Sequence, residues 1–417
     1  MELFHGSIVY SKDRTSLAVH EDSWLGVENG AVAGLWPRLP EACAGAPVTE
    51  LGQGVLIPAF SDLHVHAPQY LNRGLEMDLL LQDWLEQCTF PMEARFADLD
   101  FAKLVYDAFL RDMVDNGTLH ACVFGSIHRP ATGYLLERMD QLGMKGFVGK
   151  VNMDRNASAD LVETAEGSLR ETEAFLEAYA HNKHTRPILT PRFAPTCTEE
   201  LISGLGKLGK KYGVGVQTHL VESRWEAKTA RALFPDRSCD TEIYEVAGLM
   251  DNGPVVGAHF IFPTEADVDI LQRHGGFAVH CPDATTSIIA GIMETGALLD
   301  RGVRIGLGSD VSGGHHVGVY TQAGRAAQLS KLKQFYEPEG NRKLSFPEAF
   351  FLATRQGGAL FGKVGAFEPG YAFDALVIDG LHDGARALTP AQVVERFCYI
   401  GSPANITARY LDGRKLP

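Results

Sequence analysis

The sequence lacks the long apolar runs and the leader pattern that mark membrane and secreted proteins. None of the 417 residues falls in an apolar run of about 18, the length that a membrane-spanning helix requires. Residues 1–5 do not form a basic segment followed by an apolar one, as a secretory signal does. We therefore expect a cytoplasmic protein with no membrane partner.

Cysteine is scarce and irregularly placed. No two of the seven cysteines have the C-x-x-C spacing, and their number is odd. This argues against a disulfide framework and against a cysteine-based zinc site. The sequence predicts reduced thiols at Cys43, Cys88, Cys122, Cys197, Cys239, Cys281 and Cys398.

Positive charge is in deficit. Lys and Arg number 38 against 52 for Asp and Glu, so the net charge is -14. A chain of this charge repels polyanions, and we expect no nucleic-acid polymer as a partner. Hydrophobic residues at 45% and charged residues at 22% are typical of a globular protein with a buried core.

From about residue 50 the chain alternates short runs rich in Val, Ile and Leu with longer helical stretches, the pattern of βα units. Eight strands are predicted, at 55–66, 118–124, 146–151, 187–193, 214–219, 255–259, 277–281 and 303–310. Helices are predicted between them, among others at 98–116, 161–180, 199–211 and 265–273. No G-x-G-x-x-G follows the first strand and no Walker loop occurs, so a (β/α)8 TIM-type barrel of the α/β class is favoured over a doubly wound sheet.

The two ends of the chain lie outside this alternation. Short strands are predicted at 3–10, 17–20 and 25–27, and again at 373–378 and 406–411. We expect these segments to pair into a small composite β-sandwich domain, made of residues 1–55 and 366–417. Residues 56–365 then form the metal-dependent catalytic barrel.

The sequence contains 15 histidines, two of which form the pair His64 and His66. Chance alone gives about 0.5 His-x-His pairs in such a chain, so the pair by itself is equally compatible with two hydrogen-bonded loop residues. In a strand, however, residues i and i+2 share one face. Two imidazoles on one face at the end of a buried strand can bind one metal ion.

Later strands strengthen the metal interpretation. His219, His259 and Asp310 each end a predicted strand, and a barrel gathers these strand ends at its catalytic face. Four imidazoles and a carboxylate suit zinc or iron(II), and such a set leaves a position for water. The sequence therefore predicts a mononuclear hydrolytic site.

Several further runs occur in a fixed order around these residues. They are HAPQY at 66–70, DWLE at 83–86, TFP at 89–91, VGKV at 148–151, TPRF at 190–193, QTHLVE at 217–222 and GLGSD at 306–310. Together with the metal motif, they resemble the guanine deaminases of the amidohydrolase superfamily, in the branch that deaminates nucleobases and related heterocycles. The resemblance extends over about residues 56–365.

The resemblance implies a role for each matching residue. The metal ligands would be His64, His66, His219 and Asp310, with His259 at the remaining position of the metal shell. It implies one Zn²⁺ per chain, with iron possible, and a homodimer. Glu222 matches the proton shuttle, although a carboxylate there is also compatible with a helix cap. Asp310 would act as a second proton acceptor.

The resemblance also implies a base-binding set. Gln69, Arg192 and Phe193 match residues that bind guanine in the family, although an ion pair would also explain Arg192 and core packing would also explain Phe193. His280 is expected to orient a metal ligand or the hydroxide without binding the metal itself. Lys150 ends the third strand and is not expected to bridge metals, since that role belongs to the fourth strand.

The expected reaction is hydrolysis of guanine, with water as co-substrate, to xanthine and ammonia. Where the family commonly has HCPNSN, this chain has HCPDAT, so Asp283, Ala284 and Thr285 depart from the pattern, as does Cys88 in the segment before TFP. Alternatives are a deaminase of 8-oxoguanine, a triazine or a pterin, and a non-catalytic scaffold on the same fold. The H-x-E and P-C-x-x-C signature of the cytidine-deaminase type is missing.

Overall fold

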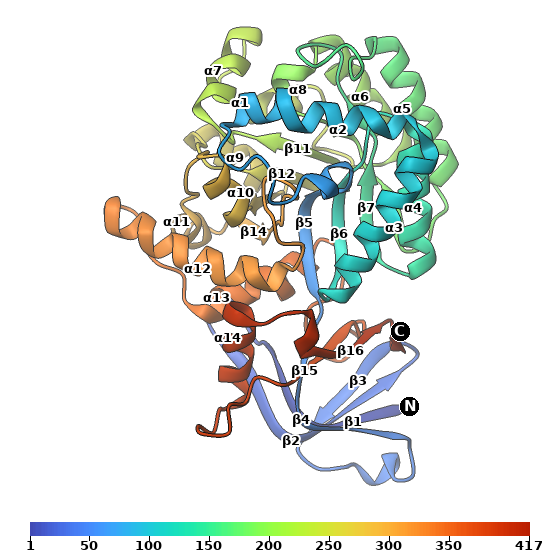
Figure 1. Cartoon of the computed structure of the whole chain (residues 1–417), viewed down its shortest axis with the longest axis vertical. Helices are drawn as coiled ribbons and strands as arrows, with labels where there is room; N and C mark the ends of the chain where they lie inside the picture. The colour runs from blue at the N-terminus through green and yellow to red at the C-terminus, as the bar shows by residue number, and fades with distance from the viewer.

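Parallel strands form a closed barrel in the computed structural model, which describes residues 1–417 (Figure 1). The eight positions of the barrel are β5 (Phe60–His66), β6 (Thr118–Phe124), β7 (Lys145–Gly149), β9 (Thr185–Pro187), β11 (Val216–Leu220), β12 (Val255–His259), β13 (Phe277–His280) and β14 (Arg304–Leu307). Short β8 (Val151–Asn152) and β10 (Thr190–Pro191) extend the third and fourth positions and pair with each other. The predicted barrel is confirmed.

Backbone hydrogen bonds join the two four-stranded halves of the barrel. At one seam the Asp310 amide donates to the His64 carbonyl (2.9 Å) and the His66 amide donates to the Val311 carbonyl (3.2 Å). At the other seam the Gln217 amide donates to the Leu189 carbonyl (2.9 Å). The first and last strands therefore meet at the point where His64, His66 and Asp310 lie.

Helices cover the outside of the barrel. They are α3 (Leu99–Asp115), α4 (Arg129–Leu142), α5 (Ala165–Tyr179), α6 (Glu199–Tyr212), α7 (Arg224–Leu233), α8 (Asp240–Val246), α9 (Glu265–Arg273), α10 (Pro282–Ser287), α11 (Thr295–Asp300), α12 (Val319–Tyr336) and α13 (Phe346–Phe351). The helix predicted at 265–273 is α9, and Thr264 and Asp267 cap it reciprocally. The helix predicted at 161–180 starts later, because Thr164 is its N-cap and accepts from the Gly167 amide.

Side chains fill the interior of the barrel below the strand ends. A buried cluster combines residues from both halves of the barrel, namely Leu63, Cys122, Phe147, Ile188, Val256, Phe277, Val279, Cys281 and Ala284. A packed interior of this kind gives the strand ends a rigid floor. The carboxyl ends above this floor are crossed by η2 (Ala67–Asn72), α1 (Leu81–Trp84), η3 (Leu85–Thr89) and α2 (Phe90–Ala94) (Figure 1).

Both ends of the chain build the second domain, as expected, at the opposite end of the barrel from α1 and α2 (Figure 1). Its strands are β1 (Glu2–Ser11), β2 (Leu17–Glu28), β3 (Ala31–Trp36), β4 (Val48–Pro58), β15 (Ala375–Ile378), β16 (Ile406–Leu411) and β17 (Arg414–Lys415). They form one mixed seven-stranded sheet in the order β17-β16-β15-β4-β1-β2-β3. Helix α14 (Pro390–Ile400) packs between this sheet and α12. The expected sandwich thus takes the form of one hydrogen-bonded sheet.

The single strand predicted at 55–66 is two strands that serve different sheets. β4 continues to Pro58 in the small domain, and the barrel strand β5 starts at Phe60. Between them the Ala59 amide donates to the Asp374 carbonyl, and the Phe60 amide donates to the Gly117 carbonyl. The whole run is apolar because both sheets bury it, so no polar residue marks the junction. The domain division at 55/56 and 365/366 stays a prediction.

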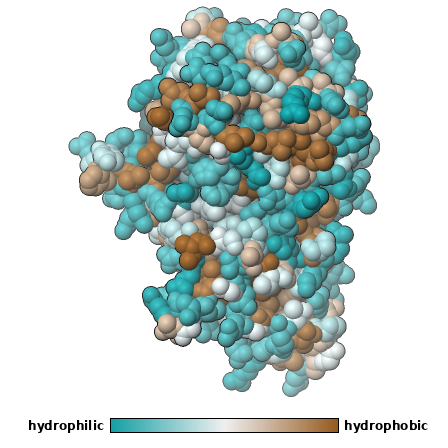
Figure 2. All heavy atoms as spheres, viewed as in Figure 1, coloured by the Kyte–Doolittle hydropathy of each residue, from teal (hydrophilic) through white to brown (hydrophobic).

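Three observations concern the surface, the cysteines and the helices. Figure 2 shows hydrophilic atoms over most of one face, with hydrophobic atoms gathered in smaller groups. All seven cysteines are free. No helix combines the length and the apolar character that crossing a membrane would need.

Candidate active site

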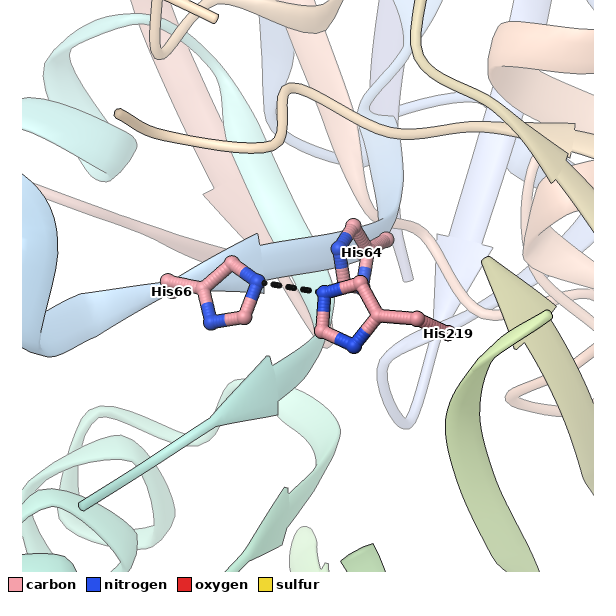
Figure 3. A group of neighbouring side chains, drawn as sticks. All are labelled: His64, His66 and His219. Atoms are coloured by element: carbon pink, nitrogen blue, oxygen red, sulfur yellow. Dashed lines mark hydrogen bonds between the residues drawn. The ribbon is translucent and has the colours of Figure 1, made fainter. Parts of the chain in front are cut away.

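Three predicted histidines come together at the carboxyl ends of β5 and β11 (Figure 3). Their nearest ring nitrogens lie within 4.8 Å of one another, and His66 Nε2 is 3.0 Å from His219 Nε2. His259 from β12 stacks beside His219, with ring centroids 5.4 Å apart. The four imidazoles therefore surround one point at the centre of the barrel mouth.

Asp310 reaches the same point from the residues after β14. Its Oδ1 lies 3.1 Å from His64 Nε2 and 3.5 Å from His66 Nε2, and its Oδ2 lies 3.8 Å from His259 Nε2. Asp310 and His259 both have left-handed backbones, with φ of 47° and 73°. Such backbones are uncommon outside glycine, and they are often found where a strand end must turn a side chain into a site.

Burial keeps these imidazoles neutral, so their contacts with Asp310 are not ion pairs. Burial lowers the pKa of His64 to about 3, with a smaller effect of the Arg192 charge. Burial also lowers the pKa of His66, His219 and His259 well below the usual value. A neutral imidazole has a free lone pair, which is the form that binds a metal ion.

The backbone of Arg192 fixes the tautomer of His219. His219 Nδ1 lies 2.7 Å from the Arg192 carbonyl oxygen, which can only accept. Nδ1 therefore carries the proton, and Nε2 presents its lone pair to the other imidazoles. Contacts of this kind orient the ligands of metal sites in proteins.

The donor set fits a divalent metal ion. Both ring nitrogens of His64 and the Nδ1 atoms of His66 and His259 have no hydrogen-bond partner within the protein, although such nitrogens are normally satisfied. The Nε2 atoms of the same three histidines face the Asp310 carboxylate at 3.1 to 3.8 Å, so one ion can contact them together. Zinc and iron(II) both accept imidazole and carboxylate ligands.

Glu222 lies beside this cluster, just after β11. Its Oε1 is 3.5 Å from His259 Nε2, and its side chain lines the same cavity as His66 and Asp310. Ser223, not Glu222, caps α7 by accepting from the Glu226 amide. Burial, reinforced by the charges of Glu226 and Asp310, raises the pKa of Glu222 well above its usual value. The raised pKa favours the protonated form of the carboxyl group.

The base-binding residues line the other side of the cavity. Gln69, Arg192 and Phe193 face the histidines across a space of about 30 Å³, closed by Leu81, Trp84, Leu85, Ile288 and Gly313. This volume holds one or two waters, so a purine enters only if a wall moves. Leu81, Trp84 and Leu85 belong to α1 and η3, the segment that crosses the barrel mouth.

Glu93 was missed by the sequence analysis. It is buried on α2, where it pairs with Arg192 (2.7 Å) and accepts from Gln69 (2.9 Å). The signal in the sequence is an acidic residue three positions after Phe90 in a short apolar segment. Nothing in that pattern identifies a partner 99 residues away.

Two other predicted residues lie outside the ring of histidines. Lys150 is fully buried and pairs with Glu163 (2.7 Å). His280 ends β13, and burial lowers its pKa to about 4. The supporting position expected for His280 stays a prediction.

Asp283, Ala284 and Thr285, which depart from the family pattern, do not line the cavity. Asp283 is buried but pairs with His316 (3.0 Å) and accepts from Gln322 (2.9 Å). None of Asp283, Ala284 and Thr285 lines the space between the histidines and Gln69. Through His316, Asp283 contacts the loop that follows Asp310.

Comparison with known proteins agrees with this geometry. The model of the amidohydrolase family matches residues 55–416, most of the chain. The chain belongs to the amidohydrolase family. Guanine deaminase from Rattus norvegicus is 33% identical to this amidohydrolase over 439 residues, which cover 99% of the chain and 96% of the rat protein. Guanine deaminase from Dictyostelium discoideum is 31% identical and covers 100% of the chain and 98% of its own length.

A solved structure is similar over the whole amidohydrolase chain. It is guanine deaminase from C. acetobutylicum with guanine bound in its active site. The two chains are 36% identical and superpose with a TM-score of 0.96, covering 100% of this chain and 99% of the other. These likenesses place the amidohydrolase among the guanine deaminases.

Proposed function

We propose that the protein hydrolyses guanine to xanthine and ammonia at a single metal ion. One observation carries the proposal: the same cavity is lined by the histidine cluster, by Glu222 and by the pair Gln69 and Arg192. The first set activates water, and the second can hold a purine ring against it. The full-length likeness to a guanine deaminase with bound guanine supports this assignment.

We propose zinc as the ion, with iron(II) as the alternative. His64, His66, His219, His259 and Asp310 would hold one ion per chain. A divalent ion bound there supplies a Lewis acid that lowers the pKa of a water towards about 7. A readout of this assignment is the metal content of the purified protein, which we expect to be one zinc per chain.

Two carboxyl groups move the protons. As the water oxygen bonds to C2 of guanine, Asp310 accepts one water proton and protonated Glu222 donates its proton to ring N3. Glu222 then takes the remaining hydroxyl proton, and Asp310 gives its proton to the amino group. The C2–N bond breaks, ammonia leaves, and both groups return to their starting states. Proton transfer by positioned groups of this kind accelerates reactions by about 10²- to 10⁴-fold.

Arg192 and Gln69 explain the preference for guanine. Guanine presents a lactam oxygen beside a ring N–H, and an amide can both donate to and accept from that edge. Adenine carries an amino group in place of the oxygen, so Arg192 would face another donor. A buried donor left without an acceptor disfavours the wrong base strongly. Phe193 would pack against the ring.

The first test is product formation. Metal-loaded protein should release equal amounts of ammonia and xanthine from guanine and should lose activity with a chelator. A panel with 8-oxoguanine, a triazine and a pterin separates guanine deaminase from the related enzymes. A metal-loaded protein that releases no ammonia from guanine would contradict the proposal.

The second test replaces the proton carrier. Glu222→Gln should lower kcat by about 10²- to 10⁴-fold, because the amide cannot accept and return a proton. The metal content should stay at one per chain, since the five proposed ligands are unchanged. Near wild-type turnover with metal bound would remove Glu222 from the mechanism.

We also propose a homodimer in the cytoplasm. The free cysteines support the compartment. The end of α12, which projects beside the barrel in Figure 1, carries the exposed apolar residues Leu332, Phe335 and Tyr336. Light scattering on the purified protein should give twice the chain mass of 45.4 kDa, and a monomer would contradict this part of the proposal.

A further inference from the structure

Glu93 lies behind the base-binding side of the cavity and contacts both residues that would read the base. Its Oε1 accepts from Gln69 Nε2 (2.9 Å), and its Oε2 accepts from Arg192 Nη1 (2.7 Å). All three side chains are at most 3% exposed. One carboxylate therefore divides its two oxygens between the two residues.

The first consequence concerns the orientation of the Gln69 amide. The carboxylate of Glu93 can only accept, so the nitrogen of Gln69 must face it. On the other side, the Ser312 amide donates to Gln69 Oε1 (3.2 Å). Both ends of the amide are thus assigned by partners that allow no flip. One N–H and one lone pair of Gln69 remain available, each in a fixed direction.

The second consequence concerns Arg192. Its guanidinium lies over the ring of Phe90, 5.4 Å from the centroid, while Glu93 binds one of its nitrogens. Phe90 and Glu93 are three residues apart on α2, so a single helical turn supplies both contacts. The charge of Glu93 also compensates Arg192, which otherwise would be an isolated buried cation.

We propose that Glu93 is a positioning residue that sets the hydrogen-bond polarity of the base pocket and so selects heterocycles with a lactam edge. The inference rests on the proposed function, since it assumes that Gln69 and Arg192 hold the base. Glu93 does not line the cavity and takes no part in proton transfer. Its effect is exerted through the two residues that it holds.

The test is Glu93→Gln. The replacement removes the charge that Arg192 needs, and its NH₂ group competes with that of Gln69, which favours the flipped amide. We expect KM for guanine to rise by about 10- to 100-fold, the size of a lost charge-assisted hydrogen bond, while kcat changes less than about threefold. Metal content should stay at one per chain.

A second substrate tests the hydrogen-bond polarity of the base pocket. The compound 2,6-diaminopurine keeps the 2-amino group but has an amino group in place of the lactam oxygen. The ratio of kcat/KM for guanine over 2,6-diaminopurine should fall by about tenfold or more in Glu93→Gln. A merely structural role would leave this ratio unchanged.

Glu163→Gln is the matched control. Glu163 also pairs with a buried cation, Lys150 (2.7 Å), but does not line the cavity. The control should lower the melting temperature without moving KM or the substrate ratio. If Glu93→Gln does not fold, Glu93→Asp keeps the charge but is too short to reach both partners, and it should raise KM in the same direction.

Two failures are distinguishable. Wild-type protein that does not deaminate guanine overturns the proposed function, and the positioning role is then judged by KM for whichever heterocycle of the panel is hydrolysed. Active, metal-loaded Glu93→Gln or Glu93→Asp with unchanged KM and unchanged substrate ratio overturns the positioning role alone. A double-mutant cycle with Gln69→Ala adds a check, because the effect of Glu93→Gln should shrink when its partner is absent.

Discussion

Histidines at the two ends of the barrel are equally buried but differ in what they contact. At the carboxyl end, both ring nitrogens of His64 lack a partner within the protein. At the amino end, His120 on β6 has a partner at each nitrogen, Ser61 Oγ at 3.1 Å and Asp374 Oδ2 at 2.9 Å. Since buried polar groups are normally satisfied, the unpartnered nitrogens of His64 fit a ligand-binding role and the partnered ones of His120 fit a structural contact.

The group at the amino end joins the two domains. Asp374 precedes β15 of the small sheet, and it also binds Lys145 Nζ (2.8 Å) and the Asp412 amide (2.7 Å). Ser61, His120 and Asp374 resemble a hydrolytic triad in composition. All three are at most 1% exposed and none lines a cavity of the site, so they act as an interdomain contact. Composition alone therefore does not identify a catalytic site, whereas partners and access do.

The largest effect is expected when the histidine cluster at the carboxyl end loses a member. His64→Ala removes a proposed ligand, and we expect activity on guanine to fall by about 10³-fold or more, because the ion supplies several kcal/mol of stabilisation to the reaction. Metal analysis should show loss of the ion. The stability of the metal-free protein should change much less than in the matched variant His120→Ala, and full metal occupancy would contradict the assignment of His64.

His120→Ala tests the amino end with the same truncation at the same burial. It leaves Asp374 with Lys145 and the Asp412 amide as its remaining partners, and it should destabilise the protein by about 3 kcal/mol. The change is measured by urea denaturation of metal-free protein. Activity per folded molecule should stay within about twofold, and an equal stability loss in His64→Ala would remove the contrast between the two ends.

Asp374→Asn tests the contact at the amino end through the pH dependence of stability. Burial raises the pKa of Asp374, but the hydrogen bond and charge of His120, together with Lys145, outweigh burial and lower it to about 2. A carboxylate with a depressed pKa stabilises the fold above its unfolded value near 3.8, and this contribution is lost as the pH falls towards 2. It amounts to about 2 kcal/mol.

The melting temperature of Asp374→Asn should therefore lie below that of the wild type at pH 7, and the gap should narrow between pH 4 and pH 2. The site residues are unchanged, so the pH profile of activity should keep its shape. A gap that stays constant down to pH 2 would show that charge at Asp374 contributes nothing.

The smallest expected effect is that of Ser61→Ala. It removes one hydrogen bond to His120 and leaves the Asp374 contacts in place, so the loss should be about 1 kcal/mol. Denaturant midpoints of Ser61→Ala and His120→Ala, measured under the same conditions, compare the stability that each contact contributes. A larger loss for Ser61→Ala than for His120→Ala would reverse the order.

The sequence predicted the parts of the molecule whose signal is local. Strands at 118–124 and 255–259 match β6 and β12, because apolar runs of that length bury both faces in a barrel. Strand ends also placed His64, His66, His219, His259 and Asp310 at one mouth. Once the barrel was recognised, strand order fixed where these residues meet.

The remaining features depend on partners that are distant along the chain. In the sequence, His120 is a histidine within an apolar strand, and nothing near it indicates its partner Asp374, which lies 254 positions later. Glu93 looks like an ordinary acidic residue of a helix in the sequence, and only the fold shows that Gln69 and Arg192 both contact it. The junction at Ala59 is hidden because two sheets bury one continuous apolar run. Pairing across such separations is set by the closed fold and leaves no local pattern.

Arg192 contributes to the site through two different parts. Its carbonyl oxygen holds His219, while its side chain faces Glu93 and the base. Every amino acid has the same backbone carbonyl, so a substitution at position 192 keeps the hydrogen bond to His219. The side chain and the backbone of Arg192 can therefore be altered separately: a substitution there changes the contact with Glu93 and the base, and the hydrogen bond to His219 remains.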